Sequence, residues 1–183
     1  PKPALPAARR NCQPYKHNKL TIRHNFPIIL SYISHKRKGG DEVKEKDGAP
    51  LPLRPHHAMC LGFFTGHGYG GEFVENMFHI RRALWKDPDR LVVLRRGADC
   101  ICAACPNNRG GVCRTAEKAA RYDEKVRRAC GFSAGRTMRW RELKSAVEAK
   151  ILSRPGARRG ICADCLWNPL CQQQDVEKSV ESV

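Results

Sequence analysis

The sequence lacks several features that would assign a function at once. Its longest apolar run, around residues 26–33, is far shorter than the about 20 residues of a membrane-spanning helix, so we expect no membrane segment. It contains no Gly-Lys-Ser/Thr sequence of the Walker type and no Gly-x-Ser-x-Gly nucleophile elbow. Walker-type phosphate binding is therefore excluded, and nucleophilic hydrolysis has no support.

Acidic residues are scarce as well. The 183 residues include 34 Lys and Arg against 18 Asp and Glu, a net charge of +16. Basic side chains bind nucleic acid through its phosphates. However, nine of the basic residues and only two of the acidic ones lie within residues 1–42, and thiolates on a metal would offset part of the remaining charge. Nucleic-acid binding stays open but is not favoured.

The first fifty residues show neither helical nor strand periodicity. They contain several prolines, scattered basic residues and a polar stretch that ends near residue 47. The chain starts at Pro1, and its first methionine is Met59. We expect residues 1–50 to be a disordered basic leader, and one hypothesis is that residues 1–42 are not native coding sequence.

From residue 51 onward, apolar segments alternate with glycines, which predicts a small, mostly helical α+β domain over residues 51–171. Residues 58–65 suit a buried strand or a helical turn. Apolar residues at helical spacing from Phe73 to Leu84 predict a helix, and residues 91–94 suit a strand. Two more helices are expected, one between a capping Thr115 and Gly131 and one over about 138–152. Residues 172–183 are expected to form a flexible tail.

Ten cysteines carry the strongest functional signal. Two segments share one pattern, a C-x-x-C pair with a third cysteine six to eight residues later. A C-x-x-C turn brings two sulfurs to one metal, and two such segments predict that the domain is organised around a metal site. The candidate ligands are Cys102, Cys105 and Cys113 in one segment, and Cys162, Cys165 and Cys171 in the other.

Three interpretations of these sulfurs compete. A disulfide framework needs an oxidising compartment, and no signal peptide is visible. A zinc ribbon separates its two pairs by about 15–20 residues, whereas 56 residues lie between these pairs. An iron–sulfur cluster suits the pattern better, because Pro106 follows Cys105 as in the ferredoxin Cys-Pro sequence and apolar residues flank the sulfurs. Zinc remains the alternative.

A third segment, Leu-Arg-Pro-His-His-Ala-Met-Cys over residues 53–60, adds further candidates. Cys60 is a candidate for a fourth thiolate ligand. Adjacent His56 and His57 are candidates for a metal ligand and for a hydrogen-bond donor behind one. The ordinary role of such histidines is structural, and that alternative stays open.

Together these motifs resemble a family of prokaryotic proteins known as domain of unknown function 1284. The similarity extends over about residues 51–171 and includes Gly-His-Gly-Tyr-Gly before Glu72, Ile-Cys-Ala-Ala-Cys-Pro at residues 101–106 and Ile-Cys-Ala-Asp-Cys-Leu-Trp at residues 161–167. The resemblance implies iron–sulfur binding. Carried over by position, it implies as ligands Cys60, Cys102, Cys105, Cys113, Cys162, Cys165 and Cys171.

These observations lead us to expect a cytoplasmic iron–sulfur protein with a [4Fe-4S] cluster. It would act with a redox protein partner in electron transfer or redox sensing. No catalytic residue is predicted, and an enzyme is not favoured. The alternative is a structural zinc protein whose basic surface binds nucleic acid or a protein partner.

Overall fold

The structure is a computed structural model that describes residues 49–180, with side chains up to residue 175. The expected leader over residues 1–50 therefore lies outside the described residues, apart from its last two. Within the described part the fold is α+β, with helices predominating, as the sequence predicts. No helix of this part is both long and apolar enough to cross a membrane.

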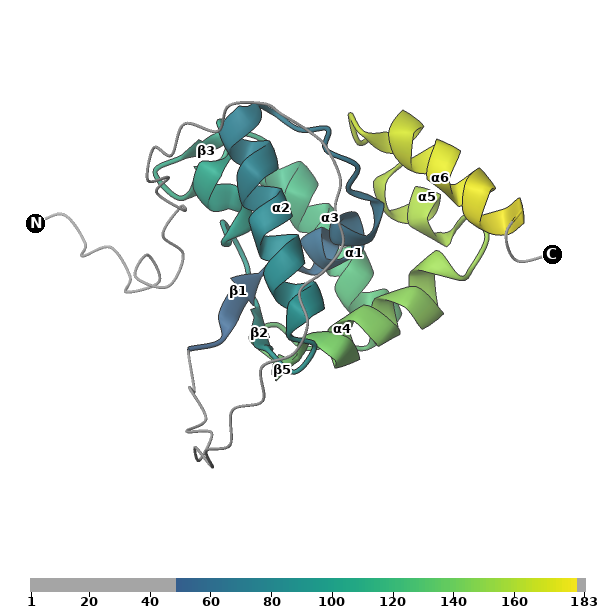
Figure 1. Ribbon diagram of the computed structural model, residues 1–183, viewed down its shortest axis with the longest axis horizontal. Coiled ribbons are helices and arrows are strands. Elements are labelled where there is room, and N and C mark those ends of the chain that lie inside the picture. Colours follow the sequence, from purple (N-terminus) through teal and green to yellow (C-terminus); the bar gives the residue numbers. More distant parts are fainter. Residues whose placement is uncertain (1–48, 181–183) are drawn as a thin grey trace, which may run out of the picture. The chain divides into compact units, whose positions relative to one another are not determined.

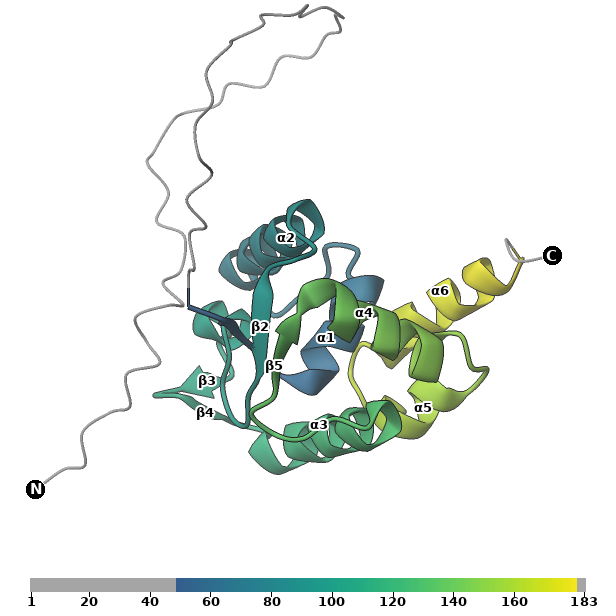
Figure 2. The ribbon, with the colours of Figure 1, turned by 90° about the horizontal axis from the view of Figure 1, so that it is seen from below.

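A small three-stranded sheet forms one side of the core, with strands in the order β1-β2-β5. Strand β1 (Leu51–Leu53) pairs in parallel with β2 (Leu91–Leu94), and β2 pairs antiparallel with β5 (Thr137–Arg139). Figure 2 shows the three strands side by side, with helix α4 next to β5. The strand predicted over residues 91–94 is thus the centre of the sheet.

Helices supply most of the core. Helix α1 (Pro55–Phe63) starts with a proline at its first turn, where the missing N–H costs nothing. It packs against α3 (Ala116–Cys130) and α4 (Trp140–Val147). Helix α2 (Gly71–Lys86) buries the face predicted from its spacing, and α3 ends at a left-handed Gly131.

Glycine is required just before α2. An added Cβ on Gly68 would lie 2.6 Å from Cδ1 of Phe73 and 2.8 Å from Cγ2 of Val74. These distances are shorter than van der Waals contact, so the loop before α2 lies directly on the first turn of that helix. Phe73 is buried and lines the cavity described below.

Three details differ from the sequence expectations. Met138 lies in strand β5 opposite Val92 rather than at the start of a helix, because residues 137–139 pair with β2. The helix begins at Trp140 and continues into a π-helical turn, η3 (Glu148–Leu152). Thr115 precedes α3, but its side chain makes no capping hydrogen bond.

The end of the chain also differs from the flexible tail expected over residues 172–183. Helix α6 (Asn168–Val180) extends through most of this range and follows the short helix α5 (Ala157–Cys162). Figure 1 shows α5 and α6 side by side at the C-terminal end of the domain. Asp175 accepts two hydrogen bonds from the buried Arg158, and Gln174 donates to the carbonyl oxygen of Phe63 at 2.8 Å. These contacts join α6 to the domain.

Candidate metal centre

Seven cysteines from distant parts of the sequence line one cavity of about 350 Å³. They come from α1, from the 3-10 helix η2 (Ile101–Ala104) and the residue after it, from β4 (Val112–Cys113), and from α5, α6 and the turn between them. The two histidines of α1 line the same cavity. The structure thus gathers around one space all the predicted site residues: Cys60, Cys102, Cys105, Cys113, Cys162, Cys165, Cys171, His56 and His57.

Four of these thiols act on one another electrostatically, and we call them the four-cysteine set: Cys60, Cys162, Cys165 and Cys171. Burial raises the pKa of the Cys60 thiol, and the charges of the other three raise it further. Burial also raises the pKa of Cys171 to about 11. The charge of Arg158 lowers this pKa, whereas the charges of Cys162 and Cys165 raise it. Cys60 comes from α1, and the other three thiols come from α5, from α6 and from the turn between them.

The other three thiols, Cys102, Cys105 and Cys113, form the three-cysteine set. Burial raises the pKa of Cys105, and the charges of Cys113 and Asp99 add to the effect. A short hairpin of β3 (Asn108–Arg109) and β4 places Asn108 opposite Cys113. The Asn108 side chain donates to the carbonyl oxygen of Cys102 at 2.9 Å. The hairpin therefore holds the third cysteine beside the turn that carries the other two.

The two C-x-x-C turns have the same backbone hydrogen bonds. In each, the N–H of the second cysteine donates to the carbonyl oxygen of the first, at 3.1 and 3.0 Å. The N–H of an asparagine three residues further on donates to the carbonyl oxygen of the second cysteine, at 2.9 and 3.0 Å. These asparagines are Asn108 and Asn168. The repeated C-x-x-C-x-x-N sequence therefore encodes a repeated turn, a signal that the sequence analysis did not use.

A carboxylate holds each histidine by its Nδ1 atom. His56 Nδ1 lies 2.6 Å from Oδ1 of Asp123, whose other oxygen accepts hydrogen bonds from Arg54 at 2.8 and 2.6 Å. Burial and the neighbouring His57 lower the pKa of His56 to about 4, so its ring is neutral at physiological pH. A neutral ring that donates from Nδ1 has a lone pair on Nε2, the usual state of a metal-binding histidine.

Asp99 occupies the corresponding place beside His57. Its carboxylate lies 2.7 Å from His57 Nδ1 and accepts the backbone N–H groups of Arg54 at 2.7 Å and Cys102 at 2.9 Å. The side chain is 0% exposed. Burial opposes its charge, but His57 and the two N–H donors outweigh burial and hold the pKa of Asp99 far below its ordinary value. Asp99 thus links the turn of the three-cysteine set to α1.

Arg158 is the buried cation of the four-cysteine set. Its guanidinium donates to Asp175 at 2.9 and 2.6 Å, to Oδ1 of Asn168 at 2.9 Å, and weakly to Sγ of Cys162 at 3.8 Å. Only 3% of Arg158 is exposed. Arg54, equally buried, stands beside the histidines. Both arginines line the cavity, and each is paired with a carboxylate, Arg54 with Asp123 and Arg158 with Asp175, at 2.6 Å.

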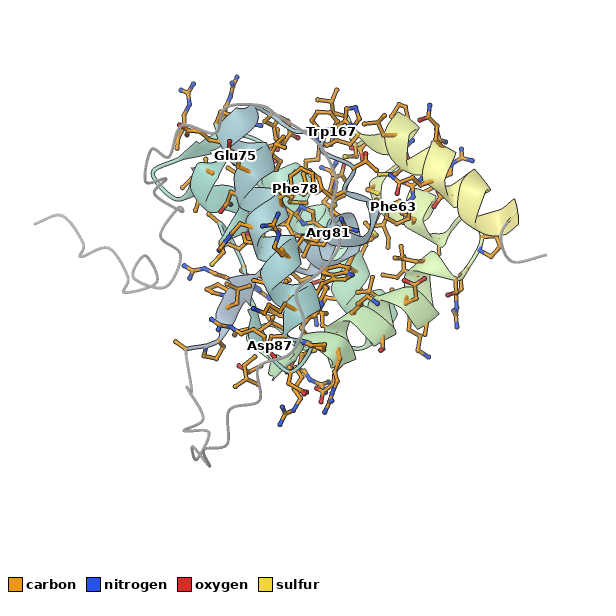
Figure 3. All side chains as sticks on the ribbon, viewed as in Figure 1. Phe63, Glu75, Phe78, Arg81, Asp87 and Trp167 are labelled. Carbon is orange, nitrogen blue, oxygen red and sulfur yellow. The ribbon has the colours of Figure 1, made fainter. Side chains whose placement is uncertain are left out.

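Aromatic side chains form much of the remaining wall. The Tyr69 ring makes edge contacts with Phe73 and Trp167, with centroids 5.4 and 5.3 Å apart. The side chains that Figure 3 labels Phe63 and Trp167 come from the end of α1 and from the α5–α6 connection, and both line the cavity. Leu166 beside them is 70% exposed. The wall is apolar, as a site that limits the access of water requires.

Five thiols of the site are shifted away from the reactive thiolate form. Burial raises the pKa of Cys102, Cys162 and Cys105 as well as that of Cys60 and Cys171. A catalytic cysteine needs the opposite shift, because the thiolate is the reactive form. A bound metal ion deprotonates coordinated thiols outright. These five thiols therefore suit metal ligands better than nucleophiles.

Several residues of this site were not predicted. Arg54 belongs to the Leu-Arg-Pro-His-His sequence, but nothing in that sequence marks it as buried. Asp99 stands three residues before Cys102, a position from which a carboxylate commonly accepts a backbone N–H in a turn. Asp123 and Arg158 carry no local signal. Two described cysteines do not line the cavity. Cys130 at the end of α3 is a free thiol, and Cys100 is buried.

The chain matches the family described as "Protein of unknown function (DUF1284)" over residues 68–171. It belongs to that family. No curated protein and no solved structure matches the chain. The match includes six of the seven cavity cysteines, whereas Cys60 and the two histidines of α1 precede it. For this DUF1284 protein the functional assignment therefore depends on the cavity itself.

Proposed function

We propose that this protein binds a [4Fe-4S] cluster on the four-cysteine set and acts in electron transfer or redox sensing. The observation that carries the proposal is the convergence of seven buried or half-buried cysteines on one cavity. Such a cluster takes four thiolates, which is the number in the set. When bound, the cluster supplies one-electron redox chemistry, and the chain supplies its ligands, its electrostatic environment and its shielding.

The spacing of the sulfurs favours a cluster over zinc. Tetrahedral zinc with Zn–S bonds of about 2.3 Å holds its sulfurs about 3.8 Å apart. Within the described part of the chain, one set of three metal-binding side chains has its donor atoms within 4.8 Å of one another, and it contains a single cysteine. No three of the four sulfurs therefore lie within 4.8 Å of one another, as three ligands of one zinc ion would. A cluster, with iron and sulfide between the thiolates, accommodates wider spacing.

The surroundings of the four-cysteine set also suit a cluster. Four thiolates and the cluster core carry net negative charge, and the buried Arg158 lies against Cys162. Phe63 and Trp167 line the same end of the cavity and limit the access of water. Burial, charge and hydrogen bonds to sulfur are the factors that set the potential of such a cluster.

We place this activity in the cytoplasm, with a redox protein as partner. All seven cysteines that line the cavity are free thiols and so available as metal ligands, whereas Cys100 outside the cavity is disulfide-bonded. The exposed Leu166 next to the cavity gives an apolar point at which an electron-transfer partner would approach. Substrate turnover by the protein itself is not favoured by the pKa values of the thiols or by any side-chain arrangement described above.

Metal analysis of the purified protein tests the proposal. The chain is purified anaerobically from iron-supplemented cells, and iron, acid-labile sulfide and zinc are measured on the sample that gives the visible spectrum. We expect a brown protein, and we expect Cys60→Ser and Cys162→Ser to lose about four irons per chain. Cys130→Ser is the matched control, because this thiol lies outside the cavity, and it should keep the wild-type content. A colourless protein with stoichiometric zinc would refute the proposal and support the zinc alternative.

A further inference from the structure

The three-cysteine set lies outside the four-ligand site proposed above. Its thiols line the same cavity, but the charges that act on Cys105 are those of Cys113 and Asp99. The charges that raise the pKa of Cys60 are those of its own set. Within the described residues, these three buried or half-buried thiols line the cavity without a fourth cysteine beyond the four-cysteine set.

His57 is a candidate for a fourth ligand, because it lies beside Cys102. Within the described part of the chain, the donor atoms of His57, Asp99 and Cys102 all lie within 4.8 Å of one another. Each of these residues is buried or half-buried, and His57 and Cys102 line the cavity. A ring nitrogen of His57 therefore lies close to Cys102, one of the three thiols of the set.

Asp99 is the positioning residue of this group and not its ligand. Both of its oxygens are engaged, Oδ1 by the Cys102 N–H and Oδ2 by the Arg54 N–H and by His57. A carboxylate that accepts from Nδ1 fixes the tautomer that leaves the Nε2 lone pair for a metal. His56 is held in a different way, by the ion pair of Asp123 with Arg54.

We propose that the three-cysteine set and His57 bind a second iron–sulfur cluster, with Cys102, Cys105 and Cys113 as its thiolate ligands. This inference rests on the proposed function, since it assumes the same cluster chemistry at a second place in the cavity. Replacing a thiolate by a neutral imidazole makes a cluster less negative and raises its potential. The protein then holds two clusters of unequal potential in one cavity, an arrangement suited to relaying electrons.

Nitrogen coordination gives this proposal a direct test. The protein is labelled with ¹⁵N-histidine and reduced, and pulsed EPR is recorded on the wild type, His57→Ala and His79→Ala. We expect a strongly coupled histidine nitrogen in the wild type and in His79→Ala, an exposed histidine of α2, and its loss in His57→Ala. A wild-type spectrum without this coupling, or a coupling that survives in His57→Ala, would overturn the assignment.

A second variant, His57→Cys, serves as a control for misfolding of His57→Ala. His57→Cys should keep the wild-type iron and sulfide content, lose the nitrogen coupling, and lower the midpoint potential of one centre while leaving the other unchanged. Unchanged potentials in a variant that keeps its iron would contradict the ligand role of His57.

Iron counting separates this inference from the proposed function. Cys113→Ser should lose the iron of the second centre and keep about four irons on the four-cysteine set. Wild-type protein with about four irons, all retained in Cys113→Ser, refutes the second cluster alone. Protein without iron refutes both.

Discussion

Replacing Asp99 by alanine should destabilise the protein strongly, because this one carboxylate satisfies three separate donors. It accepts the N–H groups of Arg54 and Cys102 and lies 2.7 Å from His57 Nδ1. The side chain is 0% exposed, so water cannot replace it. The change removes the link between α1 and the turn at η2.

The magnitude follows from the groups that lose their partner. A buried donor left without an acceptor costs about 1–3 kcal/mol. Two backbone N–H groups are affected, and His57 retains partial access to the cavity, so we expect Asp99→Ala to lower the free energy of unfolding by about 2–6 kcal/mol. This is a large share of the about 5–15 kcal/mol that holds an ordinary domain folded.

Urea denaturation followed by circular dichroism measures this loss. Asp89→Ala serves as the control, because Asp89 is 49% exposed and pairs only with surface arginines at 3.3 and 3.0 Å. Exposed pairs of this kind contribute about 1 kcal/mol or less. Both variants are compared with the wild type at equal metal content, since bound metal adds to stability. A loss in Asp99→Ala no larger than that in Asp89→Ala would refute the reasoning.

Two further predictions concern other parts of the domain. Gly68→Ala should cost about 1–3 kcal/mol in thermal or urea denaturation, because the new methyl group would press on the buried ring of Phe73. Gly71→Ala, where the added atom meets nothing within 4 Å, should leave stability unchanged or higher, and equal effects of the two changes would contradict the packing argument. Hydrogen bonds from Arg127 and Arg128 lower the pKa of Glu124 to about 2. Its contribution to stability is therefore present above its unfolded pKa of about 4.3 and is lost as the pH falls towards 2. Carboxyl NMR titration should find Glu124 still ionised at about pH 3.5, and an ordinary pKa near 4.3 would contradict this.

Sequence patterns were sufficient wherever the cause is local. The spacing of Phe73, Met77, Ile80 and Leu84 indicates the buried face of α2 without any knowledge of its partner. Gly131 ends α3 because a left-handed residue at that position favours glycine. Strand β2 follows from a short run of large apolar residues. Each depends on neighbours within one or two turns of the chain.

Strand pairing and the C-terminal helix required the tertiary structure. Met138 lies on a strand because β2 is beside it, although its local sequence is compatible with a helix. Helix α6 joins the domain through the contact of Asp175 with Arg158, 17 residues earlier, and of Gln174 with Phe63, 111 residues earlier. No local pattern encodes a contact over such separations.

The sequence by itself indicated the cysteines and histidines of the candidate metal centre, because two C-x-x-C segments and a preceding His-His-x-x-Cys carry donor atoms at spacings that a metal site uses. Only the tertiary structure decided which of those donor residues lie beside one another. Folding brings Cys60 of α1 to the cysteines around residue 165 and places His57 and Asp99 beside Cys102. The physical reason is that a ligand set is defined by proximity in space, and proximity between α1, η2 and α5 is set by the packing of the whole core.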